Sequence, residues 1–151
     1  MKLSRTNILG PDVLVPTTGA ICFTSNGALR KNGSGIMGAG IAKGFRERFA
    51  GTDLERRLGT HIKAVGNKTG IILRGWPCIV SLPTKHHWRD KADLNLVARS
   101  LAELVHLADA NEWKSVYLTK PGCGLGGLSW ENAVGPLCLK LLDDRFTVCY
   151  L

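Results

Sequence analysis

Residues 20–42 read AICFTSNGALRKNGSGIMGAGIA, and this stretch decides the fold. It begins with a short apolar run, residues 20–25, which Asn26-Gly27 ends, and this pattern predicts a buried strand. A glycine-rich loop follows the strand. Beyond the loop, apolar residues at positions i, i+4 and i+8 predict an amphipathic helix: Ile41, Phe45 and Phe49.

The same order of strand, loop and helix continues along the chain. Thr52 and Glu55 have the spacing of a capping box, which predicts a second helix that stops at Gly66-Asn67. Strands are then expected at residues 71–74 and 77–82, joined at Gly75-Trp76, and at 116–119 and 146–150. Loops are expected at residues 83–91 and 121–129. Between them, a long helix is expected, with an apolar face formed by Leu94, Val97, Leu101, Leu104, Val105 and Ala108. The last helix is expected at residues 130–142, with Val134, Leu137 and Leu141 on its inner side.

Strands that alternate with helices predict a three-layer α/β/α sandwich with a mixed, mostly parallel central sheet. At 151 residues, the chain has the size of one domain, so residues 1–151 are expected to share a single hydrophobic core. In such sheets, ligands bind at the loops that follow the carboxyl ends of strands.

The composition is that of a globular protein, with 44% hydrophobic and 21% charged residues. No apolar run approaches the roughly 20 residues that cross a bilayer, and the N-terminus lacks the pattern of a secretory signal. We therefore expect a cytoplasmic protein with no membrane partner, and a monomer. Five cysteines without a CxxC pair predict neither disulfides nor zinc, and Cys22, Cys78 and Cys149 are expected to be reduced core residues.

A net charge of +8 predicts attraction to anions, which include nucleic acid, a nucleotide and a modified acidic surface. The basic residues are spread along the chain, so charge alone does not choose among these partners. A solvated basic surface without a partner is the alternative.

Two glycine-rich loops stand in the same topological position, after a strand and before a helix. They read NGSGIMGAG at residues 32–40 and KPGCGLGG at residues 120–127. Backbone N–H groups without shielding side chains, beside a helix N-terminus, suit a diphosphate. Either loop alone could be only a tight connection, but the pair favours a binding site. Neither loop matches the Walker or the dinucleotide-binding pattern.

The two loops, together with the strand that ends in Asn26, resemble the signature of the macrodomain family, which binds ADP-ribose. The resemblance extends over nearly the whole chain. It is strongest to the branch that contains the terminal ADP-ribose protein glycohydrolase and the antitoxin macrodomains that remove ADP-ribose from DNA. This likeness implies ADP-ribose, free or attached to a macromolecule, as the ligand, with no cofactor.

The resemblance also implies site residues. The two loops would hold the diphosphate and the distal ribose through Gly33, Ser34, Gly35, Ile36, Met37, Gly122, Cys123, Gly124, Leu125, Gly126 and Gly127. Asn26 would bind ribose hydroxyls and position the distal ribose, or serve only as a turn residue. Asp12 would accept a hydrogen bond from the adenine amino group, or only start a turn. Tyr150 would border the adenine, or be an ordinary core or surface aromatic.

In the glycohydrolase branch, the lysine that corresponds to Lys85 is catalytic. An amine close to the anomeric carbon can attack it or assist the departure of the leaving group, whereas a loop lysine is ordinarily a solvated charge. The following residues are ambiguous, because Trp88 could stack on a base, cover the pocket or anchor the loop. His86-His87 lacks a third ligand at a recognisable spacing, so no metal site is expected.

The residue at position 126 differs between family members that act on protein and those that act on DNA. The protein-directed glycohydrolase has an acidic residue at this position, and the DNA-directed relatives have glycine. Any hydrolytic activity is therefore expected to favour nucleic acid. The alternatives are a non-catalytic module that reads ADP-ribose and a plain nucleic-acid-binding protein.

Overall fold

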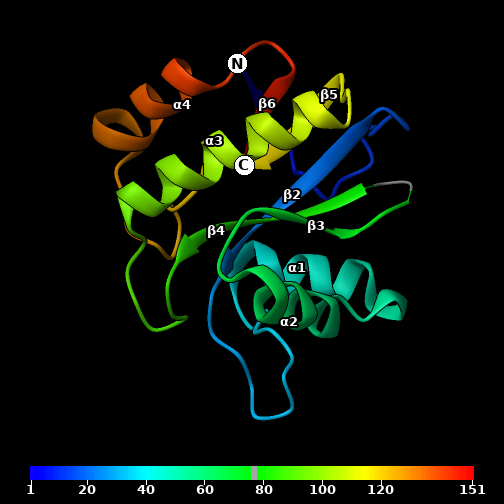
Figure 1. Cartoon of the computed structure of the whole chain (residues 1–151). Coiled ribbons are helices and arrows are strands. Elements are labelled where there is room, and N and C mark those ends of the chain that lie inside the picture. Colours follow the sequence, from blue (N-terminus) through cyan, green and yellow to red (C-terminus); the bar gives the residue numbers. More distant parts are fainter. Residues whose placement is uncertain (76–77) are drawn as a thin grey trace.

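The computed structural model describes residues 1–75 and 78–151. Within this part of the chain, one six-stranded sheet lies between α1 and α2 on one face and α3 and α4 on the other (Figure 1). The strands are β1 Lys2–Arg5, β2 Gly19–Asn26, β3 Gly70–Leu73, β4 Cys78–Lys85, β5 Ser115–Thr119 and β6 Phe146–Tyr150. The helices are α1 Gly40–Arg48, α2 Leu54–Val65, α3 Leu94–Ala110 and α4 Gly135–Leu141, with a 3₁₀ turn η1 at Ala50–Thr52 and a π turn η2 at Trp130–Val134.

The strand order is β1-β6-β5-β2-β4-β3. All neighbouring strands run parallel except β3, which pairs with β4 in the antiparallel sense. The predicted α/β/α sandwich with a mixed, mostly parallel sheet is confirmed. None of the helices in the described residues is long and apolar enough to span a bilayer.

Strand β2 is buried on both faces over residues 19–23, in agreement with its apolar run at residues 20–23. Ala20 and Cys22 belong to the core cluster that also contains α3 residues such as Leu101. Ile21 and Phe23 alternate with them and pack in the cluster under α1, where the Phe23 and Phe45 ring centroids are 5.4 Å apart. The strand therefore contributes side chains to both cores.

The strands differ most from the sequence predictions at β1 and β4. β1 was not predicted, because its four residues are mostly exposed and carry no apolar run. β4 continues to Lys85, so residues 83–85 belong to a strand rather than to the predicted loop. Trp76 and Pro77 lie outside the described residues, as do the junction and the strand start that the sequence placed there.

The helix starts also differ. The capping-box prediction is wrong, because Thr52 lies in η1 and donates its hydroxyl to Phe49 O at 2.7 Å, while Asp53 precedes α2 without a side-chain cap. The last helix begins with the π turn η2, and Ser129 Oγ accepts a hydrogen bond from Asn132 N–H there. On α3, Leu94 is 38% exposed, whereas Leu96 is buried.

The predicted burial of Cys22, Cys78 and Cys149 is confirmed. Burial raises the pKa of the Cys22 thiol, and it raises the pKa of Cys138 to about 12. These thiols remain protonated at neutral pH and behave as small apolar core residues.

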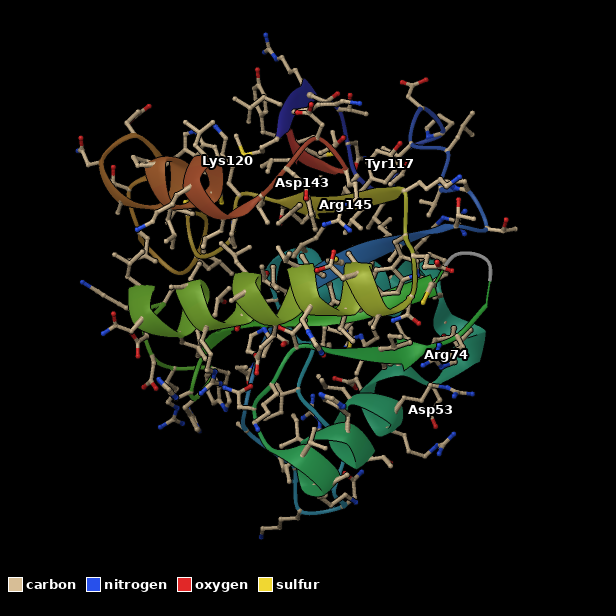
Figure 2. The ribbon with its side chains drawn as sticks, turned by 45° about the horizontal axis from the view of Figure 1, so that its top comes forward. Asp53, Arg74, Tyr117, Lys120, Asp143 and Arg145 are labelled. Atoms are coloured by element: carbon tan, nitrogen blue, oxygen red, sulfur yellow. The ribbon has the colours of Figure 1, made fainter. Side chains whose placement is uncertain are left out.

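An ion-pair cluster stands at the start of β6, away from the carboxyl ends of the strands. Arg145 forms a two-point contact with Asp143, with nitrogen–oxygen distances of 2.7 and 3.2 Å, and a second ion pair of 2.8 Å with Asp109 on α3 (Figure 2). The hydrogen bond from Arg145 lowers the pKa of the Asp143 carboxyl. This cluster joins the start of β6 to α3.

The first glycine-rich loop lies directly on α2. A Cβ atom at Gly59 would lie 2.0 Å from Gly33 O and 2.8 Å from Gly35 N, so only glycine permits this contact. Gly35 N–H also donates a hydrogen bond of 2.7 Å to the Glu55 backbone oxygen. The path of the loop is therefore set by the backbone of the helix beneath it.

Gly59→Ala should push the loop away from α2 and lower the free energy of unfolding by about 1–3 kcal/mol, the usual cost of overpacking. Gly51→Ala is the matched control, because nothing lies within 4 Å of a Cβ at that position. Urea denaturation of both variants measures the difference. Equal stability of the two variants would contradict the proposed contact.

Candidate functional site

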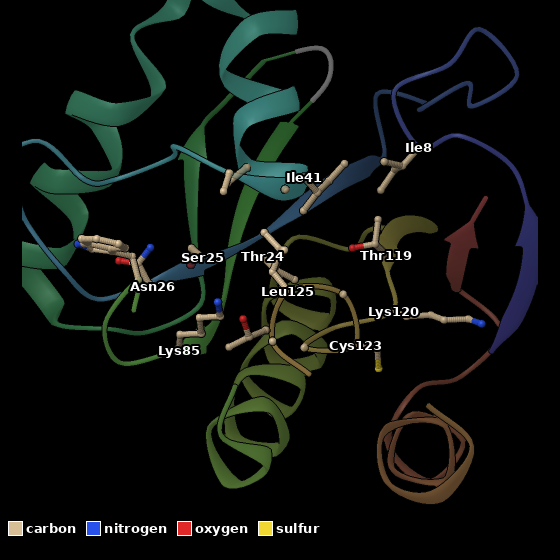
Figure 3. A pocket seen from close by; sticks show the side chains of 18 of the residues that line it. Ile8, Thr24, Ser25, Asn26, Ile41, Lys85, Thr119, Lys120, Cys123 and Leu125 are labelled. Atoms are coloured by element: carbon tan, nitrogen blue, oxygen red, sulfur yellow. The ribbon is translucent and has the colours of Figure 1, made fainter. Parts of the chain in front are cut away.

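A cleft with a cavity volume of about 1100 Å³ lies at the carboxyl ends of β2, β4 and β5 (Figure 3). Parallel strands bring their carboxyl ends to one edge of a sheet, which is why segments distant in sequence meet here. The walls comprise residues 6–8, 24–26, 38–42, 122–126 and 149–151, together with Arg30, Ile36, Thr84, Lys85, Trp88, Thr119 and Lys120.

The charge of the cleft is positive. Its lining contains the cationic side chains of Arg30, Lys85 and Lys120, and no carboxylate side chain among the described residues. Lys120 Nζ lies 4.5 Å from the centroid of the Tyr150 ring and 5.1 Å from that of Trp130, so one cation is held between two aromatic rings. The arrangement favours an anionic ligand.

Lys85 and Asn26 lie side by side. They are register partners on the neighbouring parallel strands β4 and β2, at the last residue of each strand. Figure 3 shows both side chains at the same end of the cleft. The end of β4 is held by Asn67, whose amide donates a hydrogen bond of 2.9 Å to Lys85 O.

The Asn26 side chain also supports the backbone around it. Its Oδ1 accepts a hydrogen bond of 3.0 Å from Ala28 N–H, and its Nδ2 donates one of 3.3 Å to Ile36 O. Asn26 therefore has the turn role that the sequence left open, and it also borders the cleft. Beside it, Ser25 Oγ is buried and has no hydrogen-bond partner within the described residues.

Glu55 organises the first glycine-rich loop. Its carboxylate accepts a hydrogen bond of 2.8 Å from Met37 N–H. Arg30 and Arg46 lie 3.4 and 3.9 Å from the same oxygen. The spacing of Glu55 from Thr52 predicted a helix cap, and no sequence pattern connects this residue with the loop. The structure shows it as the side chain that fixes the loop.

The second glycine-rich loop is stabilised by its own backbone and by the segment before α3. Leu128 N–H donates to Gly122 O at 2.9 Å, and Ala92 N–H donates to Gly126 O at 3.0 Å. Gly122 has a φ of 77°, a conformation that favours glycine. A Cβ at Gly126 would lie 2.5 Å from Gly122 O and 2.7 Å from Ala92 Cβ, so the loop has no room for a side chain there.

The structure brings some of the predicted site residues to the cleft and not others. Those that line it are Asn26, Ile36, Lys85, Gly122, Cys123, Gly124, Leu125 and Gly126. Those that do not are Asp12, Gly33, Ser34, Gly35, Met37 and Gly127. Asp12 is exposed, and a Cβ at Gly35 would point at Leu58, 2.6 Å away, so packing on α2 accounts for that glycine. The wall that the sequence missed follows β1, at residues 6–8.

The two histidines after Lys85 have separate partners. His86 Nε2 lies 2.8 Å from Asp93 Oδ2, and this hydrogen bond lowers the pKa of the Asp93 carboxyl. His87 Nδ1 accepts a hydrogen bond of 3.1 Å from Arg89 N–H. Both imidazoles therefore take part in the local structure of the segment.

The model of the family described as Macro domain matches residues 30–135. Proteins named DNA ADP-ribosyl glycohydrolase from Mycobacterium bovis and Mycobacterium tuberculosis are 33% identical to this chain over 124 residues. The match covers 77% of this chain and 35% of each of those proteins. The chain thus spans about a third of the length of these curated relatives.

Solved structures with the same fold include two macrodomains of DarG. The domain from Mycobacterium tuberculosis has a TM-score of 0.74 and 26% identity, with 98% of this chain and 96% of that chain covered. The domain from Thermus aquaticus has a TM-score of 0.75 and 24% identity, with 99% and 97% covered. The second likeness concerns the fold alone.

Glu55→Ala should release the first glycine-rich loop without unfolding the protein. A hydrogen bond to a charged group stabilises by about 1.5–3 kcal/mol, so amide hydrogen exchange at Met37 should become at least roughly tenfold faster. Glu47→Ala is the control, because among the residues that the structure describes that carboxylate pairs only with Lys43, on the exposed face of α1. Unchanged exchange at Met37 would remove Glu55 from this role.

Proposed function

We propose the following function from the fact that the chain belongs to the macrodomain family. The protein binds ADP-ribose in the cleft and hydrolyses the bond between ADP-ribose and a nucleic-acid base. The main observation that supports this function is that Lys85 and Asn26 are register partners on neighbouring strands, at the end of a cleft that both glycine-rich loops border.

The diphosphate would lie between the two loops. Gly38 and Gly124 both line the cleft, and nothing lies within 4 Å of a Cβ at either position, so the backbone there is open to a ligand. Exposed N–H groups and nearby cations replace the water that a diphosphate loses on binding. The positive lining of the cleft supports this placement.

The adenine would lie at the other end of the cleft, by residues 6–8 and Tyr150. These residues replace Asp12 in the proposal, because Asp12 does not line the cleft. The distal ribose would then lie near Asn26, with its anomeric carbon within reach of the Lys85 amine.

Lys85 would act as nucleophile at that carbon. The amine nitrogen bonds to the anomeric carbon through its lone pair as the bond to the base breaks. The base leaves with the bonding electron pair and takes up the proton that the alkylated nitrogen loses. Water then displaces the amine and releases ADP-ribose. Asn26 would hold the ribose hydroxyls during both steps.

Nucleic acid is the proposed carrier of the ADP-ribose. The curated relatives are named for DNA ADP-ribosyl linkages, and this chain has a net charge of +8. The lack of space at Gly126 leaves the second loop without the carboxylate of the protein-directed enzymes. We therefore propose base-linked ADP-ribose as a better substrate than glutamate-linked ADP-ribose.

Gly38→Glu should block the cleft by bulk and by repulsion of the diphosphate, and lower ADP-ribose affinity at least about 100-fold. The matched control is Gly51→Glu, which adds the same side chain in open space outside the cleft. Calorimetric titration with ADP-ribose measures both. Unchanged affinity in folded Gly38→Glu would place the ligand elsewhere, and an absence of binding by the wild type would defeat the central proposal.

Lys85→Ala should lower the turnover of ADP-ribosylated single-stranded DNA by about 100-fold or more, because the amine acts mainly in the transition state. The affinity for ADP-ribose should change far less. Lys114→Ala is the control, since this exposed lysine precedes β5 at the opposite edge of the sheet.

Release of ADP-ribose from DNA and from a glutamate-linked peptide is compared in the same assay. Turnover by Lys85→Ala equal to that of the wild type would remove Lys85 from the chemistry, and faster release from glutamate would contradict the proposed substrate. A wild type that binds ADP-ribose but releases none from either substrate would be a reader.

A further inference from the structure

An aromatic and basic stack follows Lys85 on the protein surface. Trp88 is 46% exposed, with Arg89 Cζ 4.7 Å from its ring centroid and the His87 ring centroid 5.4 Å away at an interplanar angle of 30°. We call these three residues the Trp88 stack. An anchor for the loop would be buried, as Trp113 is, so packing does not explain the position of Trp88.

The Trp88 stack is held in place by the segment that carries it. Gly27 N–H donates a hydrogen bond of 3.2 Å to His86 O, and the His86 side chain pairs with Asp93 at the start of α3. Asp90 N–H donates one of 3.0 Å to His87 O. An exposed tryptophan in a hydrogen-bonded loop loses little conformational entropy when a planar group binds to it.

The location of the stack connects it with the reacting end of the cleft. Trp88 lines the same cleft as Lys85 and Asn26. Under the proposed function, on which this inference rests, the anomeric carbon lies at this end. Whatever is bonded to that carbon must therefore leave the cleft near Trp88.

We infer that the Trp88 stack is a nucleobase platform that binds single-stranded nucleic acid beside the modified nucleotide. A base next to the ADP-ribosylated one stacks on the Trp88 ring, and Arg89 contacts the adjoining phosphate. Bases within a duplex are already stacked on their neighbours, so the platform selects single strands. On the same segment, the positive charge of Lys91 is opposed by the negative charge of Asp90. The net charge of +8 of the whole chain favours a polyanion.

The first test compares two substrates with the same reacting bond. One is a single-stranded oligodeoxynucleotide with a single ADP-ribosylated base, and the other is the modified nucleoside alone. Trp88→Ala should raise KM for the oligonucleotide roughly tenfold more than for the nucleoside, and Trp88→Phe should restore most of the loss. Arg89→Ala removes the proposed phosphate contact, and Arg56→Ala, at an exposed arginine of α2 that pairs with Asp53, is its control for charge.

A second test needs no turnover. The affinity of an unmodified single-stranded oligonucleotide is measured by fluorescence anisotropy at one fixed low salt concentration, and Trp88→Ala should weaken it roughly tenfold. Equal affinity of wild type and Trp88→Ala would overturn the platform. So would equal KM losses on the oligonucleotide and the nucleoside, because Trp88 would then act on the ribose, or an equal loss on an ADP-ribosylated peptide.

The two proposals fail separately. If the wild type releases no ADP-ribose but its affinity for the oligonucleotide depends on Trp88, hydrolysis is excluded and the platform is supported. If the wild type releases ADP-ribose and Trp88→Ala matches it in both tests, the platform is excluded and hydrolysis is supported.

Discussion

The contact between the first glycine-rich loop and helix α2 is the constraint on which the cleft depends. It is made largely by backbone atoms, because Gly59 leaves space for Gly33 O and the Glu55 backbone oxygen accepts the Gly35 N–H. The Glu55 carboxylate then holds Met37 N–H. With the loop fixed in this way, Gly38 and the residues after it face the cleft in one conformation. The wall of the cleft is therefore held in place by the helix beneath it, and a pre-organised wall lowers the entropic cost of binding a ligand.

The opposite wall of the cleft is also held by backbone hydrogen bonds. The second glycine-rich loop is joined through Gly126 O to Ala92, and Ala92 lies in the segment that leads from Lys85 to α3. The end of the cleft that holds Lys85 and the second glycine-rich loop are thus connected through a backbone hydrogen bond. Between these walls, the lining offers cations and no carboxylate side chain among the described residues. Arg30 pairs with Glu55 outside the lining, so the attraction for negative charge comes mainly from Lys85 and Lys120.

Much of the fold could be predicted from sequence, because strands buried on both faces have unbroken apolar runs and glycine-rich loops mark the turns that follow them. Strand β1 could not, because it pairs with β6 at the far end of the chain and its own residues are mostly exposed. The same gap explains why the cleft wall that follows β1, at residues 6–8, was not predicted. Glu55 was misread for a related reason, since its spacing from Thr52 imitates a helix cap while its actual partner lies in a loop 18 residues away.

Gly126 bears on how enzymes of this family could diverge. A carboxylate at this position would need space that Gly122 O and Ala92 Cβ occupy. Replacing Ala92 by glycine would remove one obstacle, but the other is a main-chain oxygen that no substitution removes. A lineage with this loop conformation could not gain the acidic residue by a single mutation, because the backbone of the loop would have to change first. Under the proposed function, a preference for one type of linkage would then persist through long periods of sequence drift, as a property of the main chain rather than of any side chain under selection.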